Sequence, residues 1–257
     1  MMTLSLAVAG KEIRDHARDV RSLLSSALMA LMGPAVVWLV ALSDRARGPE
    51  GAAVLLAMLS VFALVSAFAG AIDIAMDATA GERERRSLLP LLLNPISRSE
   101  VLIGKWIAVT TFSLAALALN AAGMVAVLAW TAPVLLAARA SQIFFWIAAG
   151  LVPLALFGAA VNLLVAVFCR TTKEAHSALR YLAFAPMLAG MFVVFFPSKI
   201  GQAWFVMPIV GQQVLIGLRE HVPAGHGAAL ALITTGGAAL ALVLAARVLD
   251  RDDILSA

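Results

Sequence analysis

Residues 106–138 read WIAVTTFSLAALALNAAGMVAVLAWTAPVLLAA, and none of these 33 side chains is charged. A bilayer core about 30 Å thick is crossed by about 20 helical residues, because each residue advances a helix by about 1.5 Å. The stretch is therefore long enough to cross a membrane as a helix. Other uncharged runs occupy 22–43, 51–72 and 140–169, with 22, 22 and 30 residues. We expect an integral membrane protein.

The composition predicts the all-α class. Hydrophobic residues make up 62% of the 257 residues and charged residues only 13%, whereas a soluble protein has about 25% charged residues. The chain has one cysteine, so it forms no internal disulfide. We expect a single transmembrane domain, 1–257, with six helical spans at about 22–42, 51–75, 105–130, 142–168, 181–198 and 227–246.

The basic residues predict how the spans are oriented, because cytoplasmic loops carry an excess of Lys and Arg. With six spans and both termini in the cytoplasm, five of the 19 basic residues lie outside: Arg45, Arg47, Arg139, Lys199 and Arg219. The remaining 14 lie inside: Lys11, Arg14, Arg18, Arg21, Arg83, Arg85, Arg86, Arg98, Lys105, Arg170, Lys173, Arg180, Arg247 and Arg251. This distribution indicates a multi-pass protein of the inner (plasma) membrane rather than a nucleic-acid-binding protein.

The segment 200–218 is ambiguous. Its 19 uncharged residues could cross once, but they include Gln202, Gln212, Gln213 and Pro208. A crossing would also place the carboxy terminus outside and weaken the charge asymmetry. Irregular backbone at membrane depth is tolerated where it packs against protein or lines a cavity. We favour a re-entrant helical hairpin, broken near Pro208, which enters from the outer face and returns before the last span.

The amino terminus predicts an interfacial "elbow" helix at 5–21. One stripe at helical spacing is apolar and contains Ile13, Ala17, Val20 and Leu24. A second, roughly opposite stripe is basic and contains Lys11, Arg14, Arg18 and Arg21. Such a helix lies at the cytoplasmic surface with its basic face on anionic lipid headgroups. The alternative is a simple anchor that fixes the orientation of the first span.

The sequence lacks three common motifs of nucleotide-binding and hydrolytic enzymes. It has no Gly-x-x-x-x-Gly-Lys-Ser/Thr phosphate loop, no His-Glu-x-x-His helix and no Gly-x-Ser-x-Gly elbow. We therefore expect no enzymatic activity, no metal site and no cofactor in this chain. Ionisable residues inside a span would mark an ion pathway. Asp73 and Asp77, at the inner end of the second span, are the candidates for such a site. The alternative is that this helix end reaches the cytoplasm. The neutral candidates for a translocation path are Asn120, Asn162, Gln212 and Gln213.

A dense polar segment interrupts the apolar runs at 73–105, DIAMDATAGERERRSLLPLLLNPISRSEVLIGK. It holds five of the 19 basic and five of the 15 acidic residues. The leucines at 88, 89 and 91–93 require a hydrophobic partner on the cytoplasmic side, and Asn94-Pro95 ends any helix there. A solvated charged loop is the alternative. We expect 76–104 to be a cytoplasmic docking segment that contacts another protein.

The pattern Asp77-x-x-Ala-Gly-Glu-Arg-Glu-Arg-Arg-Ser-Leu-x-x-Leu-Leu-x-x-Pro-x-Ser-Arg, followed by Gly-Lys, resembles the signature of ATP-binding-cassette type-2 exporter permeases, particularly their NatB-like sodium-efflux branch. KEIRD at 11–15, MPIVGQQVL at 207–215 and RDDIL at 251–255 resemble other segments of the same family. NatB-like permeases commonly carry a large extracellular insert after the first span, whereas this chain has only 43–50 there. Sodium, a lipid, an antibiotic and a hydrophobic peptide all stay open as cargo.

The resemblance implies an ATP-driven exporter in which two copies of a separate ATPase subunit bind ATP and Mg. A second permease copy, in a homodimer, would complete the transporter. Residues 79–93 would form the coupling helix, with Glu82 and Glu84 meeting basic groups of the ATPase. Acidic groups of the ATPase would meet Arg83, Arg85 and Arg86. The side chains of Leu88, Leu89 and Leu92 would pack into an apolar cleft of the ATPase. The rivals are an ion-coupled carrier or channel that uses Asp73 and Asp77, and an intramembrane enzyme.

Overall fold

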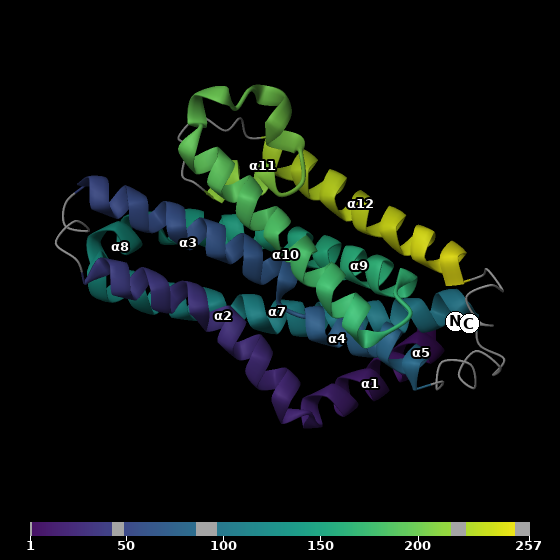
Figure 1. Ribbon diagram of the computed structural model, residues 1–257. Coiled ribbons are helices and arrows are strands. Elements are labelled where there is room, and N and C mark those ends of the chain that lie inside the picture. Colours follow the sequence, from purple (N-terminus) through teal and green to yellow (C-terminus); the bar gives the residue numbers. More distant parts are fainter. Residues whose placement is uncertain (1, 43–48, 86–96, 217–224, 250–257) are drawn as a thin grey trace.

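The computed structural model describes residues 2–42, 49–85, 97–216 and 225–249 (Figure 1). The described residues form helices and connecting turns, without a β-strand. The long helices are α1 (Met2–Arg18), α2 (Val20–Ala41), α3 (Pro49–Ala69), α7 (Arg98–Thr131), α8 (Pro133–Trp146), α9 (Val152–Phe168), α10 (Thr172–Phe195) and α12 (His226–Leu249). The short elements are α4 (Ile72–Met76), the π-helix η2 (Asp77–Gly81), α5 (Glu82–Glu84), the π-helix η3 (Ile147–Leu151), the 3-10 turns η4 (Pro197–Lys199) and η5 (Gln202–Val206), and α11 (Val210–Ile216).

Six helical stretches are long and apolar enough to cross a membrane, which confirms the expected all-α fold with six spans. They are Val20–Ala41, Val54–Glu84, Arg98–Thr131, Ile143–Phe168, Thr172–Phe195 and His226–Leu249. The third and fifth spans are α7 and α10, and they begin at Arg98 and Thr172, earlier than the expected 105 and 181. Ser97 and Glu100 form a capping box at the start of α7, and the Thr171 side chain caps α10. These caps extend each helix through polar residues that hydropathy assigns to loops.

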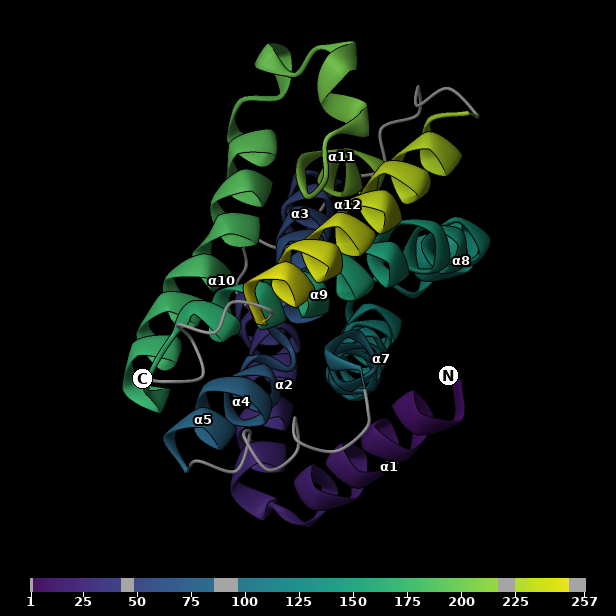
Figure 2. The ribbon, with the colours of Figure 1, turned by 90° about the vertical axis from the view of Figure 1, so that its right-hand side faces the viewer.

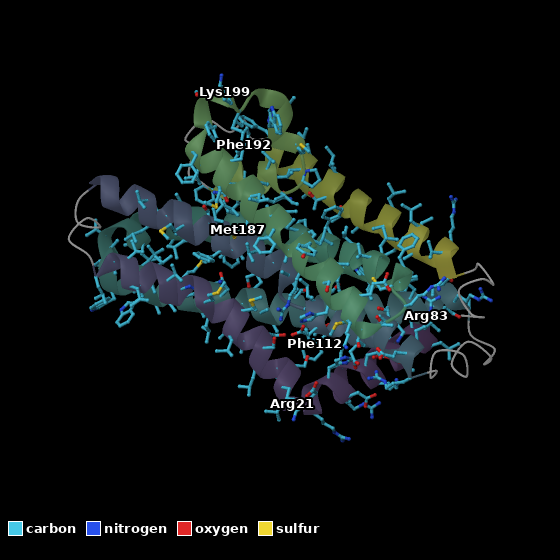
Figure 3. All side chains as sticks on the ribbon, viewed as in Figure 1. Arg21, Arg83, Phe112, Met187, Phe192 and Lys199 are labelled. Carbon is cyan, nitrogen blue, oxygen red and sulfur yellow. The ribbon has the colours of Figure 1, made fainter. Side chains whose placement is uncertain are left out.

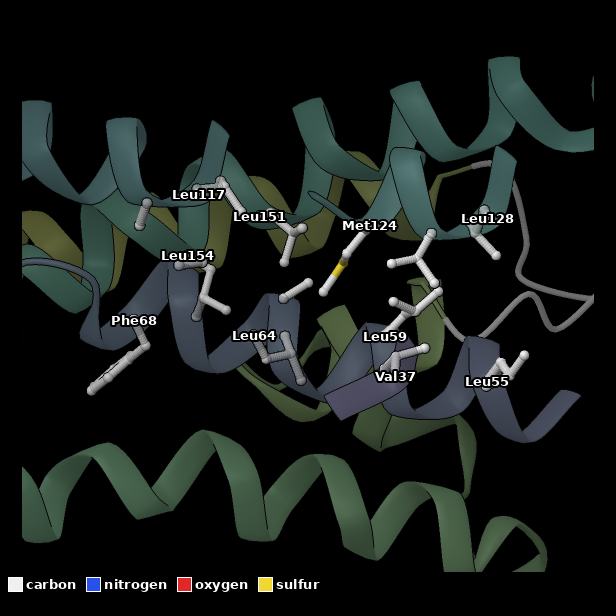
Figure 4. Packing of buried hydrophobic residues seen from close by; sticks show 14 residues of the cluster. Val37, Leu55, Leu59, Leu64, Phe68, Leu117, Met124, Leu128, Leu151 and Leu154 are labelled. Atoms are coloured by element: carbon white, nitrogen blue, oxygen red, sulfur yellow. The ribbon is translucent and has the colours of Figure 1, made fainter. Parts of the chain in front are cut away.

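The centre of the bundle is formed by α3 and α9, seen end-on in Figure 2 among α2, α7, α10 and α12. Leu64 of α3, Leu117 of α7 and Leu154 of α9 pack in one apolar cluster (Figure 4). Many side chains on the peripheral helices are large, apolar and exposed, such as Phe184 and Leu188 of α10. Apolar surfaces of this extent suit a lipid surrounding, where exposed leucine and phenylalanine are stable.

Small residues allow the two central helices to touch. A Cβ atom on Gly158 of α9 would lie 2.8 Å from both the Cα and the carbonyl oxygen of Phe68 in α3. On the other side of α9, Ala160 packs with Ala238 and Ala241 of α12. Close backbone approach through glycine and alanine is how helices associate where no hydrophobic effect drives them together.

The segment between α10 and α12 includes η4, η5 and α11. Figure 3 labels Lys199 at its edge, at the top of the view, and Arg83 at the right-hand end of the bundle. α11 has seven residues, about 10 Å of helix, which is too short to cross a bilayer. The backbone breaks near Pro208 as expected, but the part before the break is a 3-10 turn rather than a half-helix. Entry and return of this segment from the outer face stays a prediction, and 217–224 lies outside the described residues.

Candidate functional site

The polar segment begins where the helix after α3 changes its geometry. α3 ends at Ala69, α4 resumes at Ile72, and the π-helix η2 then leads into α5. Thr79 Oγ1 donates to the Ala75 carbonyl oxygen at 2.7 Å inside this stretch. A Cβ atom on Gly81 would lie 2.6 Å from Asp77 Oδ1, so a larger side chain here would displace the Asp77 carboxylate. π-helical turns are found frequently at functional sites, and this one delivers Glu82 to the buried side of the bundle.

A buried lysine is the centre of the site. The Lys105 side chain on α7 is 2% exposed, and its Nζ lies 2.7 Å from Glu82 Oε2 and 3.2 Å from Glu12 Oε1 of α1. Lys11 Nζ lies 3.4 Å from one oxygen of each of the same two carboxylates. Two cations thus face two anions, which is the condition for keeping charge inside a protein. The group joins α1, α5 and α7.

The neighbouring glycine explains how α1 comes this close. A Cβ atom on Gly104 would lie 2.7 Å from both the Ser5 carbonyl oxygen and Val8 Cβ. The buried face of α1 contains Ser5, Val8, Glu12 and His16 at helical spacing. The Gly104-Lys105 pair therefore has two tasks: the glycine admits α1, and the lysine neutralises the carboxylates that come together there.

His16 links α1 to the π-helix. Its Nδ1 lies 2.9 Å from the Glu12 carbonyl oxygen, and its Nε2 lies 3.5 Å from Asp77 Oδ2. Arg85 Nη1 donates to the other oxygen of Asp77 at 2.8 Å. Burial lowers the pKa of His16, but the Asp77 carboxylate and the Glu12 carbonyl oxygen outweigh it, so the pKa is raised. Both ring nitrogens face oxygen atoms, which favours the doubly protonated imidazolium.

For Glu12 and Lys11 of α1, too, oppositely charged partners outweigh the effect of burial on the pKa. Burial raises the pKa of Glu12, but Lys105 and Lys11 outweigh it and hold the pKa below its ordinary value. Burial likewise lowers the pKa of Lys11, and Glu12 and Glu82 reverse that effect to a net rise. Both groups are thus kept ionised by their partners. We call Lys11, Glu12, His16, Asp77, Glu82, Arg85 and Lys105 the charged cluster.

Arg83 and Glu84 fasten two further helices to the same segment. Arg83 Nη1 donates to the carbonyl oxygens of Val167 and Cys169 at the end of α9, at 3.4 and 3.2 Å. Glu84 Oε2 accepts from the backbone nitrogen and hydroxyl of Thr172 at the start of α10, at 2.8 and 2.7 Å. Backbone groups at helix ends lack helical partners, and these two side chains supply them.

The structure corrects the expectation that the charged side chains of residues 82–85 point toward a partner protein. Glu82 was expected to meet a partner's basic groups, but its carboxylate is buried on Lys105 inside this chain. Arg83, Glu84 and Arg85 also bond within the chain in the contacts described above. Of the predicted coupling residues, Arg86, Leu88, Leu89 and Leu92 lie outside the described residues, so their contact with an ATPase stays a prediction.

The expected elbow is also corrected. A helix does run through most of 5–21, but α1 ends at Arg18 and α2 starts at Val20 with Asp19 as its N-cap. The basic stripe is therefore divided, because Arg21 belongs to α2 and Lys11 turns into the charged cluster. Arg14 and Arg18 are exposed, as expected. Sequence reasoning missed Glu12 and His16, although their spacing of three or four residues with Ser5 and Val8 marks one helix face that could pack against Gly104.

Asp73 and Asp77 both have partners in the chain. Ser25 Oγ of α2 donates to Asp73 Oδ2 at 2.6 Å, and Asp77 is paired with Arg85 and His16. Within the part of the chain that the structure describes, no three His, Cys, Asp or Glu side chains come together as metal ligands. The geometry therefore gives these carboxylates a structural use at the helix end.

The four predicted path residues are all buried and hold helices together. Asn120 Nδ2 donates to the Ala30 carbonyl oxygen at 2.7 Å, and Asn162 Nδ2 to the Phe68 carbonyl oxygen at 2.9 Å. Gln212 Nε2 donates to Thr234 Oγ1 at 2.9 Å, and Gln213 Nε2 to Ser60 Oγ at 2.7 Å. We call these four bonds the amide contacts. Asn120 additionally lines a cavity, while the other three pack between helices.

Each asparagine compensates for an interrupted helix. Pro34 lies inside α2 and has no N–H, so the Ala30 carbonyl four residues earlier lacks its helical donor; the Asn120 amide replaces it. Phe68 lies one residue before α3 ends at Ala69, and Asn162 donates to its carbonyl oxygen. Neighbouring side chains commonly satisfy such freed carbonyls within membranes. This role could be recognised for Asn120 from Pro34, but the pairing of the two helices could not.

Comparison with known proteins adds a family to this geometry. Residues 6–254 match the sequence profile of ABC-2 family transporter proteins. The chain is also 31% identical over 194 residues to the "ABC transporter permease protein NatB" of Bacillus subtilis (strain 168). That alignment covers 68% of this chain and 48% of the relative. The matched part thus spans about half the length of that protein.

Proposed function

This chain belongs to the ABC-2 family of transporter proteins, and from that premise we propose that it is the membrane subunit of an ATP-driven exporter. A separate nucleotide-binding subunit, in two copies, supplies ATP hydrolysis with Mg, and a second copy of this chain completes the pore. Both termini face the cytoplasm. The observation that supports this role is the contacts of the charged cluster, Arg83 and Glu84, which connect the segment leading to 86–96 with α1, α7, α9 and α10.

The contacts on both sides of residues 86–96 suit the transfer of a displacement of these residues to several helices. Residues 86–96 are flanked by α5 on one side and by the Ser97–Glu100 capping box of α7 on the other. On the α5 side, Glu82 is bonded to α7 and α1, Arg83 to α9 and Glu84 to α10. On the α7 side, Arg98 Nη1 donates to the Leu249 carbonyl oxygen at the end of α12 at 2.6 Å. Displacement of the intervening residues by an ATPase would pull on all of these helices together.

The rival of an ion-coupled carrier finds no support in the geometry. It needs Asp73 and Asp77 available to an ion, and both accept hydrogen bonds from side chains of this chain. A charged residue that serves ion transport faces a water-filled cavity or an ion. Here Ser25 and Arg85 fill those positions.

Co-purification tests the proposed function. We would express the full tagged chain together with phosphate-loop ATPases encoded beside its gene, and measure the stoichiometry of the complex and its ATP hydrolysis in liposomes. We expect two ATPase copies for two copies of this chain. Glu82→Gln should lower transport-stimulated hydrolysis about tenfold or more, because it removes a charge from a buried network. Glu174→Gln, an exposed carboxylate outside the charged cluster, is the matched control.

Two results would contradict the proposal. One is transport by the chain alone, driven by an ion gradient; the other is equal ATP hydrolysis for Glu82→Gln and the parent complex. The topology has its own test: a cysteine introduced at Gly225 should be labelled by an impermeant reagent from outside. Labelling from the cytoplasm alone would show that the segment before α12 crosses the membrane.

A further inference from the structure

The corner where α1 meets α2 carries exposed cations that the charged cluster does not use. α1 ends at Arg18 and α2 begins at Val20, with Asp19 in an extended conformation between them. Arg18 and Arg21 are exposed, and among the described residues neither guanidinium group has a hydrogen-bond or ion-pair partner. The Asp19 carboxylate accepts instead from the Arg21 backbone nitrogen, at 3.1 Å. Two guanidinium groups are therefore available to an outside anion, and phosphate oxygens fit their paired donors.

The exposed surface of α1 has an apolar and a basic side. Leu6 and Ala17 are exposed on one side, and Arg14 and Arg18 on the other, each pair at helical spacing. Figure 2 shows α1 lengthwise beside α7, which is seen end-on, so α1 runs across the direction of the spans. A helix with these two sides, placed in this way, lies in the boundary between membrane and water. Its basic side then meets the lipid headgroups.

The exposed stripe of α2 continues from the corner into the membrane. Leu24 and Leu28 follow Arg21 at spacings of three and four residues, and these two leucines are 57% and 70% exposed. Seven residues advance a helix by about 10 Å. A cation thus stands at one end of an apolar track about 10 Å long. This pairing fits the phosphate and the first part of an acyl chain of one phospholipid molecule.

We propose that this corner binds an anionic phospholipid, whose phosphate lies at Arg18 and Arg21 and whose acyl chain follows Leu24 and Leu28. Arg14, on the same side of α1 as Arg18, adds a third exposed cation near the headgroup. The excess of positive charge selects an anionic over a zwitterionic headgroup, and the apolar track selects a lipid over an acidic protein. The site goes beyond the proposed function and does not depend on it. A lipid bound there would hold α1, the helix that reaches the charged cluster.

Fluorescence quenching by brominated lipids tests the site. A bimane fluorophore would be attached to the thiol of a Leu28→Cys, Cys169→Ser variant, which leaves one cysteine to label. The full chain, without ATPase, would be placed in phosphatidylcholine vesicles with rising fractions of dibrominated phosphatidylglycerol or dibrominated phosphatidylcholine. We expect half-maximal quenching at a fraction of phosphatidylglycerol about fivefold lower or less, since one basic residue near an anionic surface contributes about fivefold in affinity.

Charge variants assign the preference to the corner. Arg18→Gln together with Arg21→Gln should make the two brominated lipids quench equally. Lys173→Gln together with Arg180→Gln is the matched control, because it removes the same charge from exposed positions of α10 and should keep the preference. Arg18→Lys together with Arg21→Lys retains both charges and should retain most of the preference.

Four results would overturn the inference. They are equal quenching by the two lipids in the parent chain, a preference that survives the double glutamine variant of the corner, a preference that is also lost in the α10 control, and no quenching by either lipid, which would mean that protein covers this stripe of α2. None of them touches the proposed function, because ATP hydrolysis with the partner subunit is measured in a different preparation.

Discussion

The charged cluster and the amide contacts solve the same problem with different chemistry. Each joins helices that are distant in sequence, and each lies among apolar residues. The cluster uses full charges at the end of the spans, where Lys11 and Arg85 are still partly exposed. The amide contacts are neutral and buried, at Asn120, Asn162, Gln212 and Gln213. The difference follows from the cost of charge, which rises with depth in a bilayer far more steeply than the cost of an amide.

The two regions should also respond differently to loss of one partner. Removing a glutamine amide leaves a neutral hydroxyl behind, and Ser60 and Thr234 keep the hydrogen bonds that their hydroxyls donate to backbone carbonyls of their own helices. Removing a buried ion leaves opposite charges without compensation. We therefore expect the charged cluster to stabilise the fold only when all its charges are present. Each amide contact should contribute to stability independently of the others.

The largest effect is expected for Lys105→Met. The change leaves Glu12 and Glu82 buried beside each other without the buried cation that bonds to both, which should lower the free energy of unfolding by about 3–5 kcal/mol. Thermal unfolding in detergent micelles would measure it. Lys173→Met, at an exposed lysine of α10, should change stability by less than about 0.5 kcal/mol.

A combined variant sharpens this prediction. Lys105→Met together with Glu12→Gln and Glu82→Gln removes the three buried charges that meet at Lys105 and should recover most of the lost stability. If the triple variant is as unstable as Lys105→Met alone, side-chain packing rather than charge pairing explains the first result.

The next effect concerns Asn120 and the proline that it compensates. Asn120→Leu should cost about 1–2 kcal/mol, because the Ala30 carbonyl oxygen loses its donor inside an apolar bundle. In a Pro34→Ala background the α2 backbone supplies an N–H to that carbonyl, so the same substitution should cost less. Equal costs in both backgrounds would show that the Asn120 side chain stabilises the fold by some other contact.

A smaller effect is expected at the α11 end. Gln213→Leu removes the bond to Ser60, and amide contacts of this kind contribute about 0.6 kcal/mol on average within membranes. Ser60 keeps its bond to Ala57, so no donor is orphaned. Loss of more than about 2 kcal/mol would show that this contact behaves like the charged cluster, and the comparison between the two regions would fail.

The sequence predicted the spans because hydropathy depends on composition alone. It predicted neither contact region fully, since a pairing between distant helices depends on their register. Lys105 was recognised as basic and cytoplasmic, but its burial depends on Gly104 admitting α1, which no local pattern reveals. Glu82 was assigned to an ATPase contact from the family resemblance, and its burial follows the π-helix η2, which cannot be read from helical periodicity. The resemblance to a transporter family rested on motif order and did not need those details.

The smallest effect should appear as a pH dependence of the charged cluster. The pKa of His16 is raised in the folded chain, so its stabilising contribution is present below the ordinary histidine pKa and is lost as the pH rises through the folded value. Between about pH 6 and pH 9, the parent chain should lose up to about 0.5 kcal/mol relative to His16→Asn. Glu12, whose pKa is lowered, loses its stabilising contribution only at acid pH below this window, and Lys11, whose pKa is raised, titrates above the window. Equal pH slopes for the two proteins would mean that the imidazole stays neutral, and that α1 is held to α5 and α7 through Glu12, Lys105 and Glu82 without it.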